Sequence, residues 1–219
     1  MIKITPTNKE IAIKIAAEAF IDNPSMNWFL KNDDKKEQRM YSLCDYCVSV
    51  AMEKKGGFLS NDLNGITLIY KNDAKISFWE YVKLLFKLLN KASGWIKLPE
   101  LLHRQHQVSK RRGDKLSLYV LLFASNRTNG NSTAYEMKDF IFEYSDKMKL
   151  PIYVETASRK TKVAYERYGF QTYDSWELTG TSTVLWFLKY ENKNNGGGVS
   201  APIDESASTK VHTVYEEFA

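Results

Sequence analysis

The chain has 219 residues, which suits one domain with a tail, and hydrophobic residues make up 43% of it. The formal net charge is +5, but the densest basic run, "SKRRGDK" at residues 109–115, is too short to single out nucleic acid as a partner. No apolar stretch reaches the roughly 18 residues of a membrane span, and the start shows no signal-peptide pattern. Two cysteines give no disulfide framework. We therefore expect a soluble, cytoplasmic protein.

Apolar spacing and turn residues predict helices and strands along most of the chain. In chain order we expect a strand at 2–5, helices at 8–20 and 35–55, a hairpin around 62–65, helices at 77–95 and 99–110, a strand at 115–124, a helix ending near 149, a strand at 151–157, a helix at 160–168, and strands at 171–178 and 182–190. Thr7 and Glu10 have the spacing of a capping box at the first helix.

A helix separates the strands at 115–124 and 151–157, so these two strands are expected to lie parallel through a right-handed crossover. The remaining strands read as a meander. The fold class that follows is α+β, an α/β mixed sheet flanked by helices.

The composition changes at Asn192, where Gly, Ser, Asn and Pro become frequent. We therefore expect one domain at residues 1–191, and a linker and tail at 192–219. The last residues, "VHTVYEEFA", are compatible with disorder or with a strand added to a sheet edge.

The stretch "SNRTNGNSTAYEMKDF" at residues 125–140 joins a buried strand to a helix. A helix N-terminus offers unpaired N–H groups and partial positive charge, so a phosphate is one explanation for its polar residues. The other explanation is an ordinary turn with Ser132 or Thr133 as the helix N-cap. The residues that would hold a phosphate are Arg127, Thr128, Asn129, Gly130, Asn131 and Ser132.

Arg127-x-x-Gly130-x-Ser132 resembles the pyrophosphate loop of the GNAT superfamily of acyl-CoA-dependent N-acetyltransferases. One strand later, "YVETASRKTKVAYERYGFQ" resembles that superfamily's next strand and helix. The matching residues there are Glu155, Thr156, Tyr165, Glu166, Gly169 and Phe170. The resemblance covers about residues 116–190 and extends loosely to the hairpin "GFLSNDLNGITLIY". Ser132 departs from the usual Gly or Ala, and Ser158 and Thr161 stand where Asn is frequent.

The resemblance implies acetyl-CoA as a co-substrate and transfer of its acetyl group to a primary amine of a small molecule or peptide. It assigns the backbone of Leu122, Phe123 and Ala124 to the pantetheine arm, and the loop at 127–132 to the pyrophosphate. Ser158 and Thr161 join this cofactor-binding set, and Arg127, Lys160 and Lys162 are candidates for the 3′-phosphate.

Two side chains are candidates for the chemistry. The resemblance gives Tyr165 the role of proton donor to the leaving thiolate; the alternative is simple packing with Tyr168. Glu155 is the candidate base, on one face of its strand with Tyr153, while Ile152, Val154 and Thr156 lie on the other. The alternatives for Glu155 are a hydrogen-bond network or a solvent-facing position.

Other patterns have plainer explanations. Cys44 and Cys47 form a Cys-x-x-Cys, and His103 and His106 would complete four ligands, but the spacing does not fit a zinc finger. We expect buried thiols, surface or pocket-edge histidines, and no metal. The apolar face of the helix at 77–95 fits core packing, contact between two copies of the chain, or the wall of an acceptor pocket.

Two functional alternatives remain beside the enzyme. One is a GNAT-fold protein that binds acyl-CoA without efficient catalysis. The other is a basic module that binds nucleic acid with strong salt dependence, although the chain has no recognisable nucleic-acid motif. A membrane partner is not expected.

Overall fold

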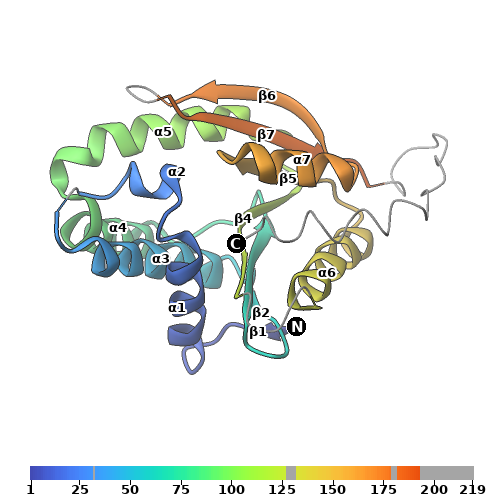
Figure 1. Cartoon of the computed structure of the whole chain (residues 1–219), viewed down its shortest axis with the longest axis horizontal. Helices are drawn as coiled ribbons and strands as arrows, with labels where there is room; N and C mark the ends of the chain where they lie inside the picture. The colour runs from blue at the N-terminus through green and yellow to red at the C-terminus, as the bar shows by residue number, and fades with distance from the viewer. Residues whose placement is uncertain (32, 127–131, 179–181, 193–219) are drawn as a thin grey trace.

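The computed structural model describes residues 1–31, 33–126, 132–178 and 182–192. These residues build a seven-stranded sheet in the order β1-β2-β3-β4-β5-β7-β6, with helices on both faces (Figure 1). The elements are β1 (Ile2–Lys3), α1 (Lys9–Phe20), α2 (Pro24–Asn27), α3 (Lys36–Glu53), β2 (Gly57–Leu59), β3 (Gly65–Lys71), α4 (Phe78–Leu88), a π-helical turn (Leu89–Ser93), a 3-10 turn (Trp95–Lys97), α5 (Leu98–Arg111), β4 (Leu118–Ser125), α6 (Ser132–Met148), β5 (Ile152–Thr156), α7 (Arg159–Arg167), β6 (Gln171–Glu177) and β7 (Val184–Tyr190).

The mixed sheet predicted from the sequence is confirmed. β4 and β5 are parallel, and every other pair of neighbouring described strands is antiparallel. The helix between β4 and β5, α6, makes the crossover that this parallel pair needs. The fold is therefore α+β, as expected.

The folded part of the chain reaches at least to Asn192, which we expected to start the linker. Asn192 is buried, and its amide donates to Ser145 Oγ at 3.2 Å and to Asp146 Oδ1 at 3.1 Å. Residues 193–219 lie outside the described residues, so the linker and tail stay a prediction. Within the described chain, no helix is both long enough and apolar enough to cross a bilayer.

The start of the first helix differs from the expected capping box. Asn8 is the N-cap of α1, and its Oδ1 accepts from the Thr5 N–H at 2.7 Å. Glu10 instead accepts a hydrogen bond from the Tyr41 hydroxyl on α3. Because Asn8 and not Thr7 is the N-cap, and the Glu10 carboxylate bonds to α3, the Thr7–Glu10 capping box is wrong.

The expected helix at 77–95 is divided. α4 ends at Leu88, and a wider π-helical turn follows until Gly94, whose φ of +77° ends the helical path. Leu88 and Leu89 are both buried. α2 was not predicted; it is a single turn in which Asn23 Oδ1 accepts from the Met26 N–H at 3.1 Å.

Two apolar cores lie on opposite faces of the sheet. Figure 1 shows α1, α3 and α4 on one side and α6 on the other. Tyr153 belongs to the core against α1 and α3, whereas Ile152 and Val154 belong to the core against α6 and α7. The predicted alternation of side chains along β5 is therefore confirmed. Cys44 and Cys47 are buried free thiols in the α1–α3 core, also as expected.

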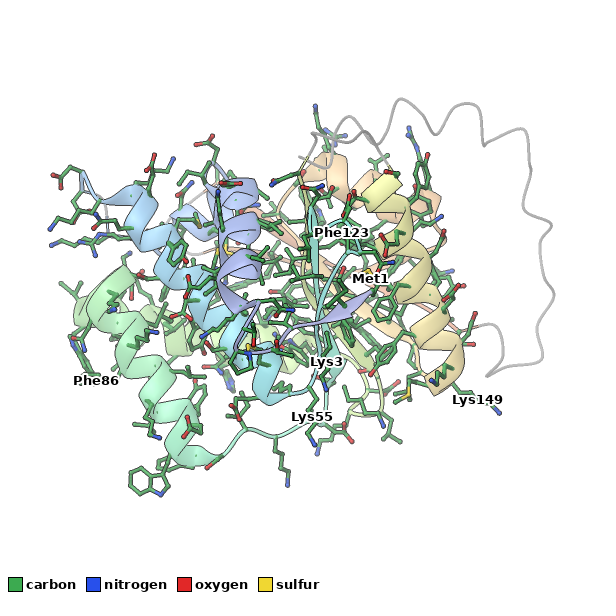
Figure 2. The ribbon with its side chains drawn as sticks, turned by 90° about the horizontal axis from the view of Figure 1, so that it is seen from below. Met1, Lys3, Lys55, Phe86, Phe123 and Lys149 are labelled. Carbon is green, nitrogen blue, oxygen red and sulfur yellow. The ribbon has the colours of Figure 1, made fainter. Side chains whose placement is uncertain are left out.

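The apolar face of α4 is only partly core, which corrects the packing that we expected there. Phe78 and Trp79 are 69% and 71% exposed. Phe86 is also exposed and lies at the outer edge of the molecule in Figure 2, far from Phe123 on β4. The 3.6-residue period predicted the helix correctly, but it does not say how much of a wide apolar face the sheet covers.

Candidate functional site

The parallel strands β4 and β5 separate in the middle of the sheet. Their pairing covers three residues of each strand and ends at Val120 and Val154. β4 then continues to Ser125 against β3, and β5 continues to Thr156 against β7. Figure 1 shows the two parts of the sheet turned away from each other there. The edges of residues 121–125 and 155–156 that face the gap therefore have no strand ladder between them.

A bulge in β4 lies where the gap begins. Leu68 pairs with Leu122 and Ile69 with Val120, so Leu121 is an extra residue on β4. An inserted residue bends its strand and reverses the alternation of side chains after it. Leu121 and Leu122 consequently both pack on the α1–α3 face, whereas Phe123 packs on the α6–α7 face. The bulge thus turns β4 away from β5.

A cavity of about 350 Å³ occupies this gap, and we call it the cleft cavity. The ends of α1, α2, β4, β5 and the start of α7 surround it. Its walls include the site residues predicted on β4, β5 and α7: Leu122, Phe123, Ala124, Glu155, Ser158, Thr161 and Tyr165. Residues distant in sequence therefore meet around one space that is large enough for part of a ligand.

Tyr165 reaches the cleft cavity from α7. Its ring packs against Phe170 with centroids 5.1 Å apart, on the α6–α7 face of the sheet. Burial raises the pKa of Tyr165 far above the usual value for tyrosine. The hydroxyl therefore stays protonated at neutral pH and can donate a proton but not accept one as a phenolate. The ring thus packs against Phe170, whereas the alternative predicted from the sequence was packing with Tyr168; the donor role of the hydroxyl stays a prediction.

Glu155 lies near the end of β5, opposite Phe187 of β7. Its side chain lines the cleft cavity, and its Oε2 is buried without a hydrogen-bond partner. A buried carboxylate oxygen normally has a partner, so this one is poised to accept from a ligand or from water. The solvent-facing alternative for Glu155 is wrong, because that oxygen is buried.

The start of α7 closes one side of the cleft cavity. Ser158 is the N-cap of this helix, and its Oγ accepts from the Thr161 N–H at 3.2 Å. The Ser158 N–H donates in turn to Thr156 Oγ1 at 3.1 Å. Ser158 and Thr161 thus hold the helix start against the cavity, while the hydroxyl of Ser158 already has a structural role.

Most of the predicted phosphate loop lies outside the residues that the structure describes. Arg127, Thr128, Asn129, Gly130 and Asn131 lie outside the described residues, and Ser132 begins α6. Thr133, the other candidate cap, donates instead to Asp62 Oδ2 at 2.6 Å on the β2–β3 turn. This contact ties the start of α6 to the hairpin beside it. The pyrophosphate assignment stays a prediction from the sequence.

A second cavity of about 440 Å³ adjoins the first, and we call it the adjoining cavity. It lies among α2, α3, β3, α4, α5, β4 and β5. Both cavities are bordered by the same five residues: Ser25, Met26, Arg104, Leu121 and Glu155. Glu155 therefore stands at the boundary, in reach of whatever enters from either side.

Arg104 of α5 holds together the residues at the boundary between the two cavities. Its guanidinium donates to the Ser25 carbonyl at 3.1 Å and to Ser25 Oγ at 2.8 Å, and it lies 5.7 Å from the ring centroid of Trp28. α5 is thereby joined to the α2 turn. α5 supplies one wall of the adjoining cavity, with Tyr81 of α4 beside it.

The polar residues of the adjoining cavity were not predicted from the sequence. Lys54, Tyr70, Arg104 and Arg112 all line it. The one available signal was the basic run at 109–115, which contains Arg112 and which we considered only for nucleic acid. His103 and His106 are exposed on α5, as expected. Among the described residues there is no group of His, Cys, Asp or Glu that could hold a metal ion.

Comparison with solved structures gives the same architecture. No protein-family model matches the sequence, and no curated protein matches it. The chain is similar to a "histone acetyltransferase HPA2 and related acetyltransferase" from Corynebacterium glutamicum, with a TM-score of 0.60, 12% identity, and coverage of 92% of this chain and 97% of that one. An N-acetyltransferase from Staphylococcus aureus Mu50 gives a TM-score of 0.52 at 11% identity, over 86% of this chain and 98% of that one.

The C-terminal condensation domain of Ebony, solved in complex with beta-alanyl-dopamine, gives a TM-score of 0.54 at 11% identity, over 87% of this chain and 97% of that one. At such identities the likeness concerns the fold. The fold is that of the GNAT superfamily of N-acetyltransferases, as the resemblance of residues 116–190 predicted.

Proposed function

We propose that this protein is an N-acetyltransferase that moves the acetyl group of acetyl-CoA to a primary amine of a small molecule or peptide. One observation carries the proposal: the cleft cavity crosses the gap between β4 and β5 and meets a second cavity at Glu155. Two cavities that meet at a buried carboxylate suit a reaction between two substrates. The likeness in fold to acetyltransferases supports this assignment.

The gap between the strands suits the pantetheine arm. This arm is an extended chain with two amide groups, and the described ladder between β4 and β5 ends at Val120 and Val154, before the end of β4. Leu122, Phe123 and Ala124 would pair their backbone with these amides, much as a strand adds to a sheet. The pyrophosphate would then lie toward residues 127–132, at the start of α6.

The chemistry divides between two residues that line the cleft cavity. The amine nitrogen attacks the thioester carbonyl carbon, so that a C–N bond forms and the C–S bond breaks. Glu155 takes the proton that the amine loses, directly or through one water. Tyr165 gives its proton to the departing thiolate, and solvent restores it. Protons and charge therefore balance over one turnover.

Isothermal titration of the full chain with acetyl-CoA, and separately with CoA, is the first test. Micromolar binding, accompanied by thermal stabilisation that grows with ligand concentration, is expected. Absence of binding at millimolar acetyl-CoA would contradict the proposal. Gly130→Val is the matched variant, because a side chain at this predicted loop position would keep the backbone from a pyrophosphate. We expect that variant to lose CoA affinity and to keep its melting temperature.

A second measurement separates an enzyme from a protein that only binds acyl-CoA. Release of the CoA thiol is followed while acetyl-CoA is mixed with a panel of primary amines. Thiol release that depends on the amine supports turnover. Tight binding of acetyl-CoA without amine-dependent release from any panel member would favour the binding protein.

A further inference from the structure

The adjoining cavity holds more positive than negative charge. Its described lining includes three basic side chains, Lys54, Arg104 and Arg112, and a single carboxylate, Glu155. Arg104 is already engaged with Ser25 and Trp28 at the boundary of the two cavities. Lys54 and Arg112 therefore remain as the two charges that an acceptor in this cavity would meet.

These two cations are held side by side by a pair of tyrosines. Tyr70 of β3 and Tyr119 of β4 are register partners, and their rings lie 5.7 Å apart. Lys54 Nζ lies 4.2 Å from the Tyr70 ring centroid, and the Arg112 guanidinium carbon lies 3.6 Å from the Tyr119 centroid. Stacking on an aromatic face fixes a cation in place without neutralising its charge.

Neither cation forms an ion pair with any carboxylate in the described part of the chain. Arg112 Nε is buried without a hydrogen-bond partner, and so are Tyr119 Oη and Glu155 Oε2. The Tyr119 hydroxyl lies beside both Arg112 and Glu155, so the three groups also interact with one another. Buried polar atoms are normally paired, so atoms beside a cavity that have hydrogen-bonding capacity left suit a ligand. The ligand must supply acceptors to the guanidinium and donors to the carboxylate.

An amino acid offers both. Its carboxylate accepts from Arg112 and Lys54 in the planar geometry that a guanidinium prefers, and its amine donates to Glu155. Glu155 is close enough to Arg112 and Tyr119 to influence both electrostatically, so the two ligand groups must lie near each other. Apart from Ser25 and Gln105, the rest of the lining, which includes Phe29 and Leu43, is apolar or aromatic and suits a hydrophobic side chain.

We propose that the acetyl acceptor is an amino acid with an apolar or aromatic side chain, and that Lys54 and Arg112 bind its carboxylate. This inference rests on the proposed acetyl transfer. Polyamines and lysine-rich peptides are disfavoured by the same geometry, because they would bring further positive charge to two unpaired cations. Simple arylalkylamines would leave both cations without a partner.

Matched pairs of amines test the proposal directly. The pairs are phenylalanine with 2-phenylethylamine, tyrosine with tyramine, and leucine with 3-methylbutylamine. Each is titrated into the full chain saturated with CoA, and each is assayed with acetyl-CoA. We expect the member that carries the carboxylate to bind and react better by about tenfold or more. O-Phosphoethanolamine is included to separate a carboxylate site from a phosphate site.

Variants connect the preference to these side chains. Lys54→Met and Arg112→Gln are expected to raise the KM of the amino acid about tenfold or more, with the dissociation constant of CoA unchanged. Lys110→Met, the same change at an exposed lysine of α5 outside the cavity, should change neither value. Lys54→Glu should remove the preference for the carboxylate, which a merely structural lysine would not do.

The outcomes separate this inference from the proposed function. Acetyl-CoA binding with equal or better transfer to the amines that lack a carboxylate would overturn the amino-acid acceptor alone. Preference for O-phosphoethanolamine over every amino acid would overturn it in favour of a phosphate. Failure of all amino acids to bind the CoA complex would also overturn it. Failure to bind acetyl-CoA at all would remove the proposed function first.

Discussion

Tyr70 and Tyr119 face each other across β3 and β4, and a different cation lies on each ring: Lys54 on the first and Arg112 on the second. Lys54 comes from the end of α3, and Arg112 follows α5. Two like charges from distant parts of the chain are thus held together by one cross-strand pair. Two like charges held close together lower the stability of the folded chain unless a ligand of opposite charge compensates them. The cost can therefore be measured as a change in melting temperature.

The first prediction concerns the stability cost of Lys54. Desolvation, and after it the charge of Arg112, lowers the pKa of Lys54 from 10.5 to about 8. Between these pH values the unfolded chain binds more protons than the folded one, so folding becomes more favourable as pH rises through this window. Lys54→Met removes the effect. Its melting temperature should exceed that of the wild type at pH 7, and the difference should shrink at pH 10.

The same group predicts how acceptor binding depends on pH. A bound carboxylate favours protonated Lys54, so affinity for an amino acid should fall as pH rises above about 8. Burial raises the pKa values of Tyr70 and Cys47 to about 12. The neighbouring Tyr119, Tyr70 and Glu155 raise the pKa of Arg112 above its usual value, against the effect of burial. These three neighbours of Lys54 therefore do not titrate near pH 8. In Lys54→Met the fall above pH 8 should disappear. An unchanged pH profile in that variant would exclude Lys54 from the acceptor site.

The second prediction separates the hydroxyl of Tyr165 from its ring. Tyr165→Phe keeps the packing against Phe170 and removes the proton donor, so kcat should fall about 10²- to 10³-fold. The dissociation constant of CoA and the melting temperature should stay as in the wild type. Tyr168→Phe is the matched control, because Tyr168 is the C-cap residue directly after the same helix and does not border the cleft cavity. Equal effects of the two variants would leave Tyr165 with packing alone.

The cleft residues were predicted from two motifs that resemble those of the GNAT superfamily, because each motif is one continuous piece of the sequence. Glu155, Ser158 and Tyr165 belong to one strand–turn–helix unit, whose local spacing fixes their arrangement once the strand and helix form. The long apolar run of β4 likewise predicted a buried strand. Its bulge at Leu121 was not predictable, because no residue of the run departs from the apolar pattern.

The adjoining cavity could not be read from the sequence for a different reason. Lys54 and Arg112 lie far apart in the chain and meet only because β3 and β4 pair in one register. A lysine at a helix end and an arginine in a short basic run are each typical surface residues. Only tertiary packing places them over two tyrosine rings, and no local pattern encodes that outcome.

The third prediction concerns the turn that positions Lys54. Gly56 joins α3 to β2, and a Cβ there would lie far inside contact distance of the Ile69 carbonyl oxygen. Backbone cannot move aside as a side chain can, so Gly56→Ala should destabilise the protein by about 2–3 kcal/mol. At this chain length the melting temperature should drop by about 4–12 °C.

Gly57→Ala is the neighbouring control for that substitution. The three atoms nearest to a Cβ at Gly57 all belong to the side chain of Ile4, the nearest at 3.1 Å, and that side chain can shift. Its melting temperature should therefore fall by much less than that of Gly56→Ala. Similar losses in thermal unfolding of the two variants would mean that the Gly56–Ile69 contact relaxes easily.

The fourth prediction tests Glu155 as the base through the pH profile. Glu155→Gln keeps the shape of the side chain but cannot take a proton, so kcat/KM at pH 7 should fall about 10²-fold. At higher pH the free amine loses its proton unaided, so the activity of the variant should rise steadily with pH and approach that of the wild type. Glu177→Gln, the same change at an exposed position of β6, should leave the profile unaltered. A Glu155→Gln enzyme with the wild-type profile would show that water alone deprotonates the amine.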